Sequence, residues 1–148
     1  MLRGTPSLVS VFLCFVCLHI LTPHPATRRC TQDTIRRVNV LIEKAPSLTW
    51  LNTRLYTPKS TDHEQKCPSS TLKCFAAEVK VLTEEWMEVV ENFPRLKLDK
   101  MLYTLASTFK QAESDCPECE LLQEENAENF LNCLLSTLQC MNSLYCNR

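Results

Sequence analysis

Apolar residues recur every three or four positions in four stretches of the chain, the periodicity of an amphipathic α-helix. These stretches cover residues 31–45, 69–93, 98–109 and 118–144. Pro46 ends the first stretch and Pro94 ends the second, which could be one long helix or two helices that meet near Thr83. None shows the sustained alternation of apolar and polar residues that is typical of a strand. The pattern therefore predicts an all-α fold.

Four amphipathic helices bury their apolar sides best against one another, so the expected architecture is a four-helix bundle. The irregular connection over residues 47–68 can run the height of the bundle, which allows the first two helices to lie parallel. The connection over residues 113–117 is short enough for a hairpin, unless the third helix ends before Phe109. The pattern alone therefore leaves an up-up-down-down order and an up-and-down order open.

Composition excludes several classes of function for this chain of 148 residues. Gly4 is the single glycine, so the chain cannot hold a glycine-rich phosphate loop. His63 is the one histidine beyond His24, so a hydrolytic triad or a catalytic zinc site lacks its usual groups. A formal net charge of −1 gives no general attraction to nucleic acid. We expect a protein that is not an enzyme and needs no cofactor or metal.

Residues 1–26 are typical of a secretory signal peptide. Arg3 precedes an apolar run over residues 8–21, which is shorter than the roughly 20 residues of a membrane span. Cleavage after Ala26 places His24 where a small residue is preferred, so the cleavage site is uncertain. The interpretation favoured is a secreted domain over residues 27–148 that does not insert into membranes, and the competing one is an uncleaved anchor.

The cysteines predict disulfides, because oxidised thiols persist in secreted proteins. Of the ten cysteines, Cys14 and Cys17 fall in the signal peptide, and the mature domain keeps Cys30, Cys67, Cys74, Cys116, Cys119, Cys133, Cys140 and Cys146. Two bridges that join the pair Cys67 and Cys74 to the pair Cys116 and Cys119 would staple the long connection and the second helix to the start of the fourth. The alternatives are a zinc site of four thiolates and a redox pair in the Cys116-x2-Cys119 motif.

A third bridge is expected to close the other end of the bundle. Cys30 precedes the first helix, so it lies near the end of the fourth helix where these two helices are antiparallel. Cys146 or Cys140 is therefore its expected partner.

Two segments, residues 55–82 and 113–142, carry a resemblance to a known family. The matching residues are Leu55-Tyr56-Thr57, Cys67, Leu72-Lys73-Cys74-Phe75, Glu78, Val81, Cys116, Glu118-Cys119-Glu120, Glu124, Asn126, Phe130 and Leu131. In these residues the chain resembles the interleukin-15 family of four-helix cytokines and its interleukin-15-like relatives. The resemblance implies the up-up-down-down order and the disulfides Cys67–Cys116 and Cys74–Cys119.

The resemblance also implies receptor contacts. Members of this family are presented by a sushi-domain alpha receptor and signal through a beta chain and the common gamma chain. Carried over by position, the alpha-receptor contacts are Tyr56, Glu78, Val81, Glu85 and Glu120, and the gamma-chain contact is Gln139. Helical spacing places Glu78, Val81 and Glu85 on one side of the second helix, where carboxylates can pair with Arg or Lys. An ordinary solvated acidic surface is the competing interpretation.

The chain departs from the family where the beta chain binds. An acidic position of the family's first helix falls on Arg36-Arg37, and two polar positions of its third helix fall on Lys97 and Met101. Because reversed charge changes the choice of partner, the resemblance leaves the use of a beta chain open.

We therefore expect a secreted helical cytokine that brings receptor chains together on lymphocytes. The alternative from another class is a secreted, disulfide-rich helical carrier of a small apolar ligand. A cavity lined by Trp86, Phe93 and Phe109 would favour the carrier. A packed core with an acidic patch around Glu78 and Glu120 would favour the cytokine.

Overall fold

The computed structural model describes residues 30–59, 67–110 and 116–146, and the predicted signal peptide lies outside these ranges. The described part contains the four α-helices α2 (Gln32–Lys44), α4 (Pro68–Val89), α5 (Leu98–Ala106) and α6 (Ala127–Cys146). The shorter elements are the 3₁₀ helices η3 (Ala45–Leu51) and η4 (Cys119–Leu121) and the strands β1 (Arg54–Tyr56) and β2 (Glu124–Asn126). The prediction of a four-helix bundle is confirmed.

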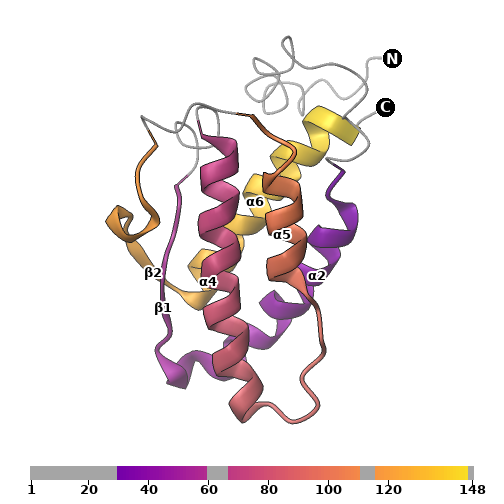
Figure 1. Cartoon of the computed structure of the whole chain (residues 1–148). Helices are drawn as coiled ribbons and strands as arrows, with labels where there is room; N and C mark the ends of the chain where they lie inside the picture. Colours follow the sequence, from indigo (N-terminus) through magenta and orange to yellow (C-terminus); the bar gives the residue numbers. More distant parts are fainter. Residues whose placement is uncertain (1–29, 60–66, 111–115, 147–148) are drawn as a thin grey trace, which may run out of the picture.

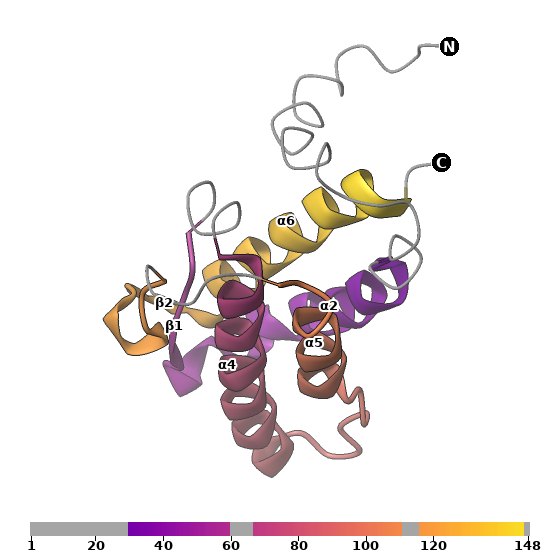
Figure 2. The same ribbon diagram turned by 45° about the horizontal axis from the view of Figure 1, so that its top comes forward.

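The helices follow the up-up-down-down order. In Figure 1, α2 and α4 run in one direction and α5 and α6 run in the other, and each parallel pair is joined by a connection that returns along the bundle. Contacts pair α4 with α5 and α2 with α6, so the helices form two layers (Figure 2). The third helix ends at Ala106, before Phe109, and this early end leaves enough chain for the second return connection.

The fourth helix starts later than the sequence pattern predicts. The pattern places its start at residue 118, which is wrong, because α6 begins at Ala127. The side chain of Asn126 accepts a hydrogen bond from the backbone N–H of Asn129 at 2.8 Å, and this bond caps the first turn. Residues 124–126 pair with β1 instead. Glu124 and Glu125 therefore lie in β2, Glu120 in η4 and Glu118 just before η4, rather than in α6.

The start of α4 and the chain after the end of α2 also differ from the predictions made from the sequence. The pattern places the start of the second helix at residue 69, whereas α4 begins at Pro68, with Cys67 at the N-cap. Proline suits the first helical position because its missing N–H would have no partner there. The same helix continues through Thr83 to Val89 without a break. After α2 ends at Lys44, the chain continues as η3 rather than as an irregular connection.

The core lies between the two layers of helices. Its largest fully buried side chains are Trp86, Phe75, Phe130, Leu41, Leu55, Leu72, Leu82, Leu98, Leu102, Leu131, Leu134 and Leu138. The ring centroids of Phe75 and Phe130 lie 5.4 Å apart, which is the spacing of a favourable aromatic pair. These two rings join α4 to α6 across the bundle.

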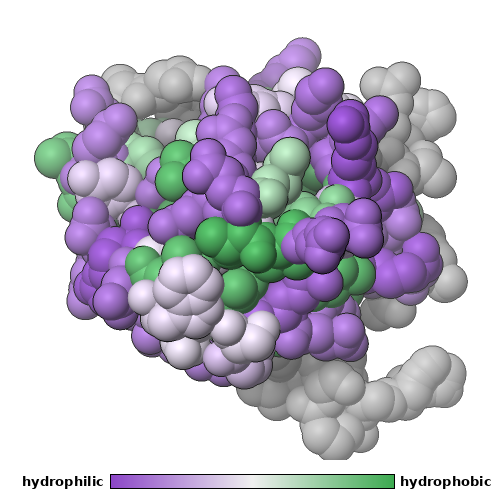
Figure 3. Space-filling view, turned by 90° about the horizontal axis from the view of Figure 1, so that it is seen from below, coloured by the Kyte–Doolittle hydropathy of each residue, from purple (hydrophilic) through white to green (hydrophobic). Residues whose placement is uncertain are grey.

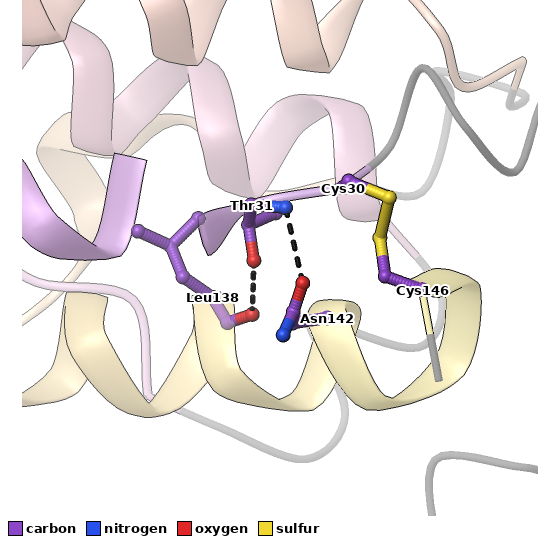
Figure 4. The surroundings of a disulfide bond; sticks show 5 residues. All are labelled: Cys30, Thr31, Leu138, Asn142 and Cys146. Atoms are coloured by element: carbon purple, nitrogen blue, oxygen red, sulfur yellow. Dashed lines mark hydrogen bonds between the residues drawn. A yellow bond between two sulfur atoms is a disulfide. The ribbon is translucent and has the colours of Figure 1, made fainter. Parts of the chain in front are cut away.

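Three links close the end of the bundle where α2 begins and α6 ends (Figure 4). Cys30 forms a disulfide with Cys146, with a Cα–Cα distance of 5.3 Å. The hydroxyl of Thr31 donates to the carbonyl of Leu138 at 2.8 Å, and the Thr31 N–H donates to Asn142 Oδ1 at 3.2 Å. Of the two partners expected for Cys30, the structure joins it to Cys146.

Candidate functional site

Two disulfides fix the return connection before α6 against the first half of α4. Cys67 is bonded to Cys116 and Cys74 to Cys119, with Cα–Cα distances of 5.9 Å and 5.4 Å. These are the pairs that the resemblance implies. Because the four sulfurs join in this way, they are arranged neither as ligands of one zinc ion nor as a redox bond between Cys116 and Cys119.

Strand β1 lies between strand β2 and helix α4. Its antiparallel register with β2 places Tyr56 opposite Glu124 and Arg54 opposite Asn126. Toward α4, the Tyr56 N–H donates to Glu78 Oε2 at 2.5 Å, and the Thr53 hydroxyl donates to Glu85 Oε1 at 2.5 Å. Two glutamates, two helical turns apart on α4, therefore hold β1 in place.

These contacts bring three carboxylates together. Burial raises the pKa of Glu78, and the negative charges of Glu124 and Glu120 raise it further, while the hydrogen bond from the Tyr56 N–H acts in the opposite direction. Glu120 is exposed on η4, which the bond between Cys74 and Cys119 holds beside α4. Among the residues that the structure describes, none forms an ion pair with Glu78, Glu120 or Glu124.

The neighbouring carboxylate of Glu125 is different, because it has a cation of its own. Lys59 Nζ lies 2.7 Å from Glu125 Oε2, and the hydrogen bonds from Lys59 and Asn129 lower the pKa of Glu125. The same bond raises the pKa of Lys59. The negative charge of Glu125 is therefore neutralised by a cation within the chain. The carboxylates of Glu78, Glu120 and Glu124 have no such cation in the described part of the chain and are available to a partner.

Apolar residues accompany these carboxylates. Val81 is 49% exposed on α4, one turn from both Glu78 and Glu85, and Leu121 is 76% exposed on η4. We define the acidic face as the surface that contains Tyr56, Glu78, Val81, Glu85, Glu120, Leu121 and Glu124. Sequence reasoning missed Leu121 and Glu124 as site residues. Only the pairing of β2 with β1 shows that Glu124 lies next to Tyr56.

Gln139, the candidate gamma-chain contact, does not belong to the acidic face. It is exposed on α6, next to Leu138, whose carbonyl accepts the bond from Thr31. It therefore lies toward the end of the bundle that the Cys30–Cys146 disulfide closes.

Three of the positions expected from the resemblance to depart from the family meet between α2 and α5. Arg37, Lys97 and Met101 line a hollow of about 440 Å³ with Cys30, Thr34, Lys100, Thr104 and Leu105, and we call this hollow the basic groove. Arg36 is exposed on α2, 3.0 Å from Asp33. In Figure 1, β1 and β2 lie along one flank of α4 while α5 and α2 lie on the other, so the acidic face and the basic groove are on different flanks.

The three aromatic residues expected to line a carrier cavity are packed instead. Trp86 is 1% exposed within the core, and Phe93 and Phe109 pack against that core. Exposed apolar side chains occur elsewhere, at Trp50 in η3 and at Met87 and Val89 near the end of α4. Figure 3 shows apolar atoms in the middle of the lower end of the molecule. The filled core favours the cytokine over the carrier.

Comparison with known proteins connects this geometry to a family. The family model described as Interleukin 15 matches residues 11–142, which include the whole described bundle up to the last turn of α6. The chain belongs to the interleukin-15 family. No solved structure gives a significant match to it.

Individual relatives in the interleukin-15 family cover different shares of the chain. Interleukin-15 of Mus musculus is 29% identical over 149 residues, which cover 88% of this chain and 89% of the relative. Interleukin-15 of Ailuropoda melanoleuca is 33% identical over 94 residues, which cover 60% of this chain and 54% of the relative. Interleukin-15 of Homo sapiens is 31% identical over 94 residues, which also cover 60% of this chain and 54% of the relative. The chain thus matches about half the length of several of these relatives.

The described helices include none that is both long enough and apolar enough to cross a bilayer.

Proposed function

We propose that this member of the interleukin-15 family is a secreted, non-enzymatic cytokine that binds a sushi-domain alpha receptor through its acidic face. The observation that carries the proposal is the cluster of Glu78, Glu120 and Glu124, which are close enough to influence the pKa of Glu78. Repulsion between these negative charges destabilises the folded protein unless a cationic partner neutralises them. A receptor surface with Arg or Lys side chains would supply that partner.

The hydrogen bonds within the chain leave room for this partner. Glu78 accepts the Tyr56 N–H with one carboxylate oxygen, and Glu85 accepts the Thr53 hydroxyl with one oxygen. A carboxylate has about four acceptor sites, so both residues retain sites for a bidentate arginine. The internal bonds then fix the direction in which the carboxylates face.

Val81 and Leu121 complete the surface as an interface. Stable interfaces combine a few desolvated anchors with charged groups at the rim. Val81 and Leu121 are the exposed apolar residues beside the carboxylates, and their exposed fractions of 49% and 76% leave most of their area to be buried by a receptor.

A second receptor chain would bind elsewhere on the cytokine. We propose that Gln139 contacts a common-gamma-type chain, since its place on α6 leaves it accessible while the acidic face is occupied. Signalling on lymphocytes would follow when the two chains are brought together. A beta chain at the family's aligned positions would have to present acidic groups, because Arg37, Lys97 and Lys100 line the groove there.

Calorimetric titration of the secreted protein with an isolated sushi-domain receptor tests the alpha-receptor site. We expect binding that weakens by about a hundredfold in the variant Glu78→Gln/Glu120→Gln, because two charge-assisted bonds are lost. The matched control is Glu43→Gln/Glu91→Gln, which removes the same charge from exposed positions outside the acidic face. The absence of binding by the native protein, or equal weakening in both variants, would contradict the proposal.

The gamma-chain contact is tested separately on the preformed complex with the alpha receptor. The variant Gln139→Ala should keep its affinity for the alpha receptor and lose affinity for the ectodomain of the gamma chain. Unchanged recruitment of the gamma chain would remove Gln139 from the site.

A further inference from the structure

The basic groove holds several cations and few groups that neutralise them. Arg37, Lys97 and Lys100 line the hollow of about 440 Å³, and the hydroxyl-bearing side chains of Thr34 and Thr104 line it with them. This volume lies in the range of sites that bind small ligands or short segments of a polymer. The net charge of the whole chain is −1, so the chain as a whole exerts no general attraction on polyanions, and any attraction has to come from a local cluster of cations such as this one.

The arginine is held in place while the lysines are free to adapt. The Arg37 guanidinium donates to the Leu96 carbonyl and to Asp33 Oδ2, which ties α2 to the residue before Lys97. Lys97 and Lys100 are exposed, and neither forms an ion pair within the described ranges. Lys97 is the N-cap of α5 and Lys100 lies in its first turn, and both side chains line the groove.

Few carboxylates oppose these cations. Asp33 is shared between Arg36 and Arg37, at 3.0 Å and 3.2 Å, so one negative charge faces two guanidinium groups. Asp99 lies in the first turn of α5 but does not line the groove. The groove therefore presents a net positive surface to any ligand that enters it.

We propose that the basic groove binds a sulfated polysaccharide chain. Sulfate groups along such a chain match cations placed at intervals, and sugar hydroxyls match the two threonines. A protein partner is less well matched, because interfaces between proteins depend on exposed apolar or aromatic anchors. The lining contains no aromatic residue, and its Leu105 is only 5% exposed.

This proposal does not depend on the proposed receptor site. The acidic face and the basic groove lie on different flanks of α4 (Figure 1), so a polysaccharide and an alpha receptor could bind together. The groove would then hold the cytokine at a sulfated surface while the acidic face stays available. A variant of the groove should leave alpha-receptor affinity unchanged, which makes failure of one proposal distinguishable from failure of the other.

The test is calorimetric titration of the whole secreted protein with a heparin-derived hexasaccharide at about 0.15 M salt. The variant Lys97→Gly/Lys100→Gln removes two charges from the groove. Lys97 has a left-handed backbone with φ of 54°, which glycine adopts readily, so this substitution should not prevent folding. The matched control Lys73→Gln/Lys80→Gln removes two charges from exposed positions of α4.

We expect the native protein and the control to bind the hexasaccharide with affinities within about twofold, and the groove variant to lose at least about tenfold. The affinity of the groove variant should also depend less steeply on salt, because fewer ions are displaced. Absence of binding up to about 100 μM, or equal loss in both variants, would overturn the proposal. Equal or tighter binding of a polyglutamate peptide would also overturn it and would point to an acidic protein partner.

Discussion

The acidic face and the basic groove are built by different kinds of bonds. On the acidic face, the disulfides Cys67–Cys116 and Cys74–Cys119, the β1–β2 ladder and two glutamate side chains fix the position of every segment. In the groove, Arg37 alone is fixed, and the two lysines project from one end of α5. A fixed surface suits a partner that is recognised by shape, while adaptable cations suit a polymer that is recognised by charge.

The largest effect is expected from removal of the bond that joins the acidic face together. The variant Cys74→Ala/Cys119→Ala should lower the free energy of unfolding by about 3–4 kcal/mol, since the bond closes a loop of 45 residues. It should also abolish alpha-receptor binding, because Glu120 is no longer held beside Glu78. Urea unfolding and receptor titration measure the two effects.

The variant Cys30→Ala/Cys146→Ala is the matched control for this prediction. It removes a disulfide at the other end of the bundle, with a separation of 116 residues, and should destabilise the fold to a similar degree. Its receptor affinity should stay close to native where it is folded. Equal loss of receptor binding in both variants would show that the Cys74–Cys119 bond has no special role in the acidic face.

A smaller effect is expected at the closed end of the bundle shown in Figure 4. The variant Thr31→Val removes the hydroxyl that donates to the Leu138 carbonyl, which then keeps only its backbone bond within α6. The free energy of unfolding should fall by about 0.5–1.5 kcal/mol. Both the acidic face and the basic groove should keep their affinities, and a change in either affinity would show that the two regions are coupled through α2 and α6.

Glycine at the start of α5 should stabilise the protein slightly. Lys97 has φ of 54°, a conformation that costs a residue with a side chain about 1–2 kcal/mol. The variant Lys97→Gly should therefore raise the free energy of unfolding by up to about 1 kcal/mol, measured by urea unfolding. The variant Asn92→Gly is the control, because Asn92 has φ of 57° but asparagine tolerates this region better, so its gain should be smaller. A loss of stability in Lys97→Gly would show that the lysine side chain contributes more than its backbone costs.

The smallest effect is a difference in pH dependence between the two regions. Because its pKa is raised, Glu78 takes up a proton before an ordinary glutamate as the pH falls. The folded state then binds more protons than the unfolded state, so this residue favours folding as the pH falls and opposes folding as the pH rises through its pKa. Receptor affinity should change in the opposite direction and weaken as the pH falls.

Titrations at several pH values would measure this difference. The native protein should show the weakening, while the variant Glu78→Gln should show less of it. Hexasaccharide binding should stay constant, because arginine and lysine keep their charge over this range. The assignment fails if Glu78→Gln has the same pH dependence of receptor binding as the native protein.

Helices could be predicted from the sequence, but the two strands could not. The apolar periodicity of residues 69–93 indicates α4 because a helix buries one side through local spacing alone. Strand β2 consists of Glu124, Glu125 and Asn126, residue types that are rare in strands. It forms because the Cys74–Cys119 bond and the pairing with β1 bring together segments about 70 residues apart.

The two functional regions were also predictable to different degrees. The resemblance placed Glu78 and Glu120 in one site, and the structure brings them together. Arg37 and Lys97 could be identified only as departures from the family pattern. Nothing in the sequence indicated that Lys100 joins them, because the groove depends on how α2 packs against α5.

A titration of two charge-reversal variants with one sushi-domain receptor separates the acidic face from the basic groove as the receptor site. The first variant is Glu78→Lys/Glu120→Lys on the acidic face, and the second is Lys97→Glu/Lys100→Glu in the basic groove. We expect the first variant to lose receptor binding and the second to bind within about twofold of the native protein. Loss of binding in the second variant with native affinity in the first would show that the receptor does not bind through the acidic face.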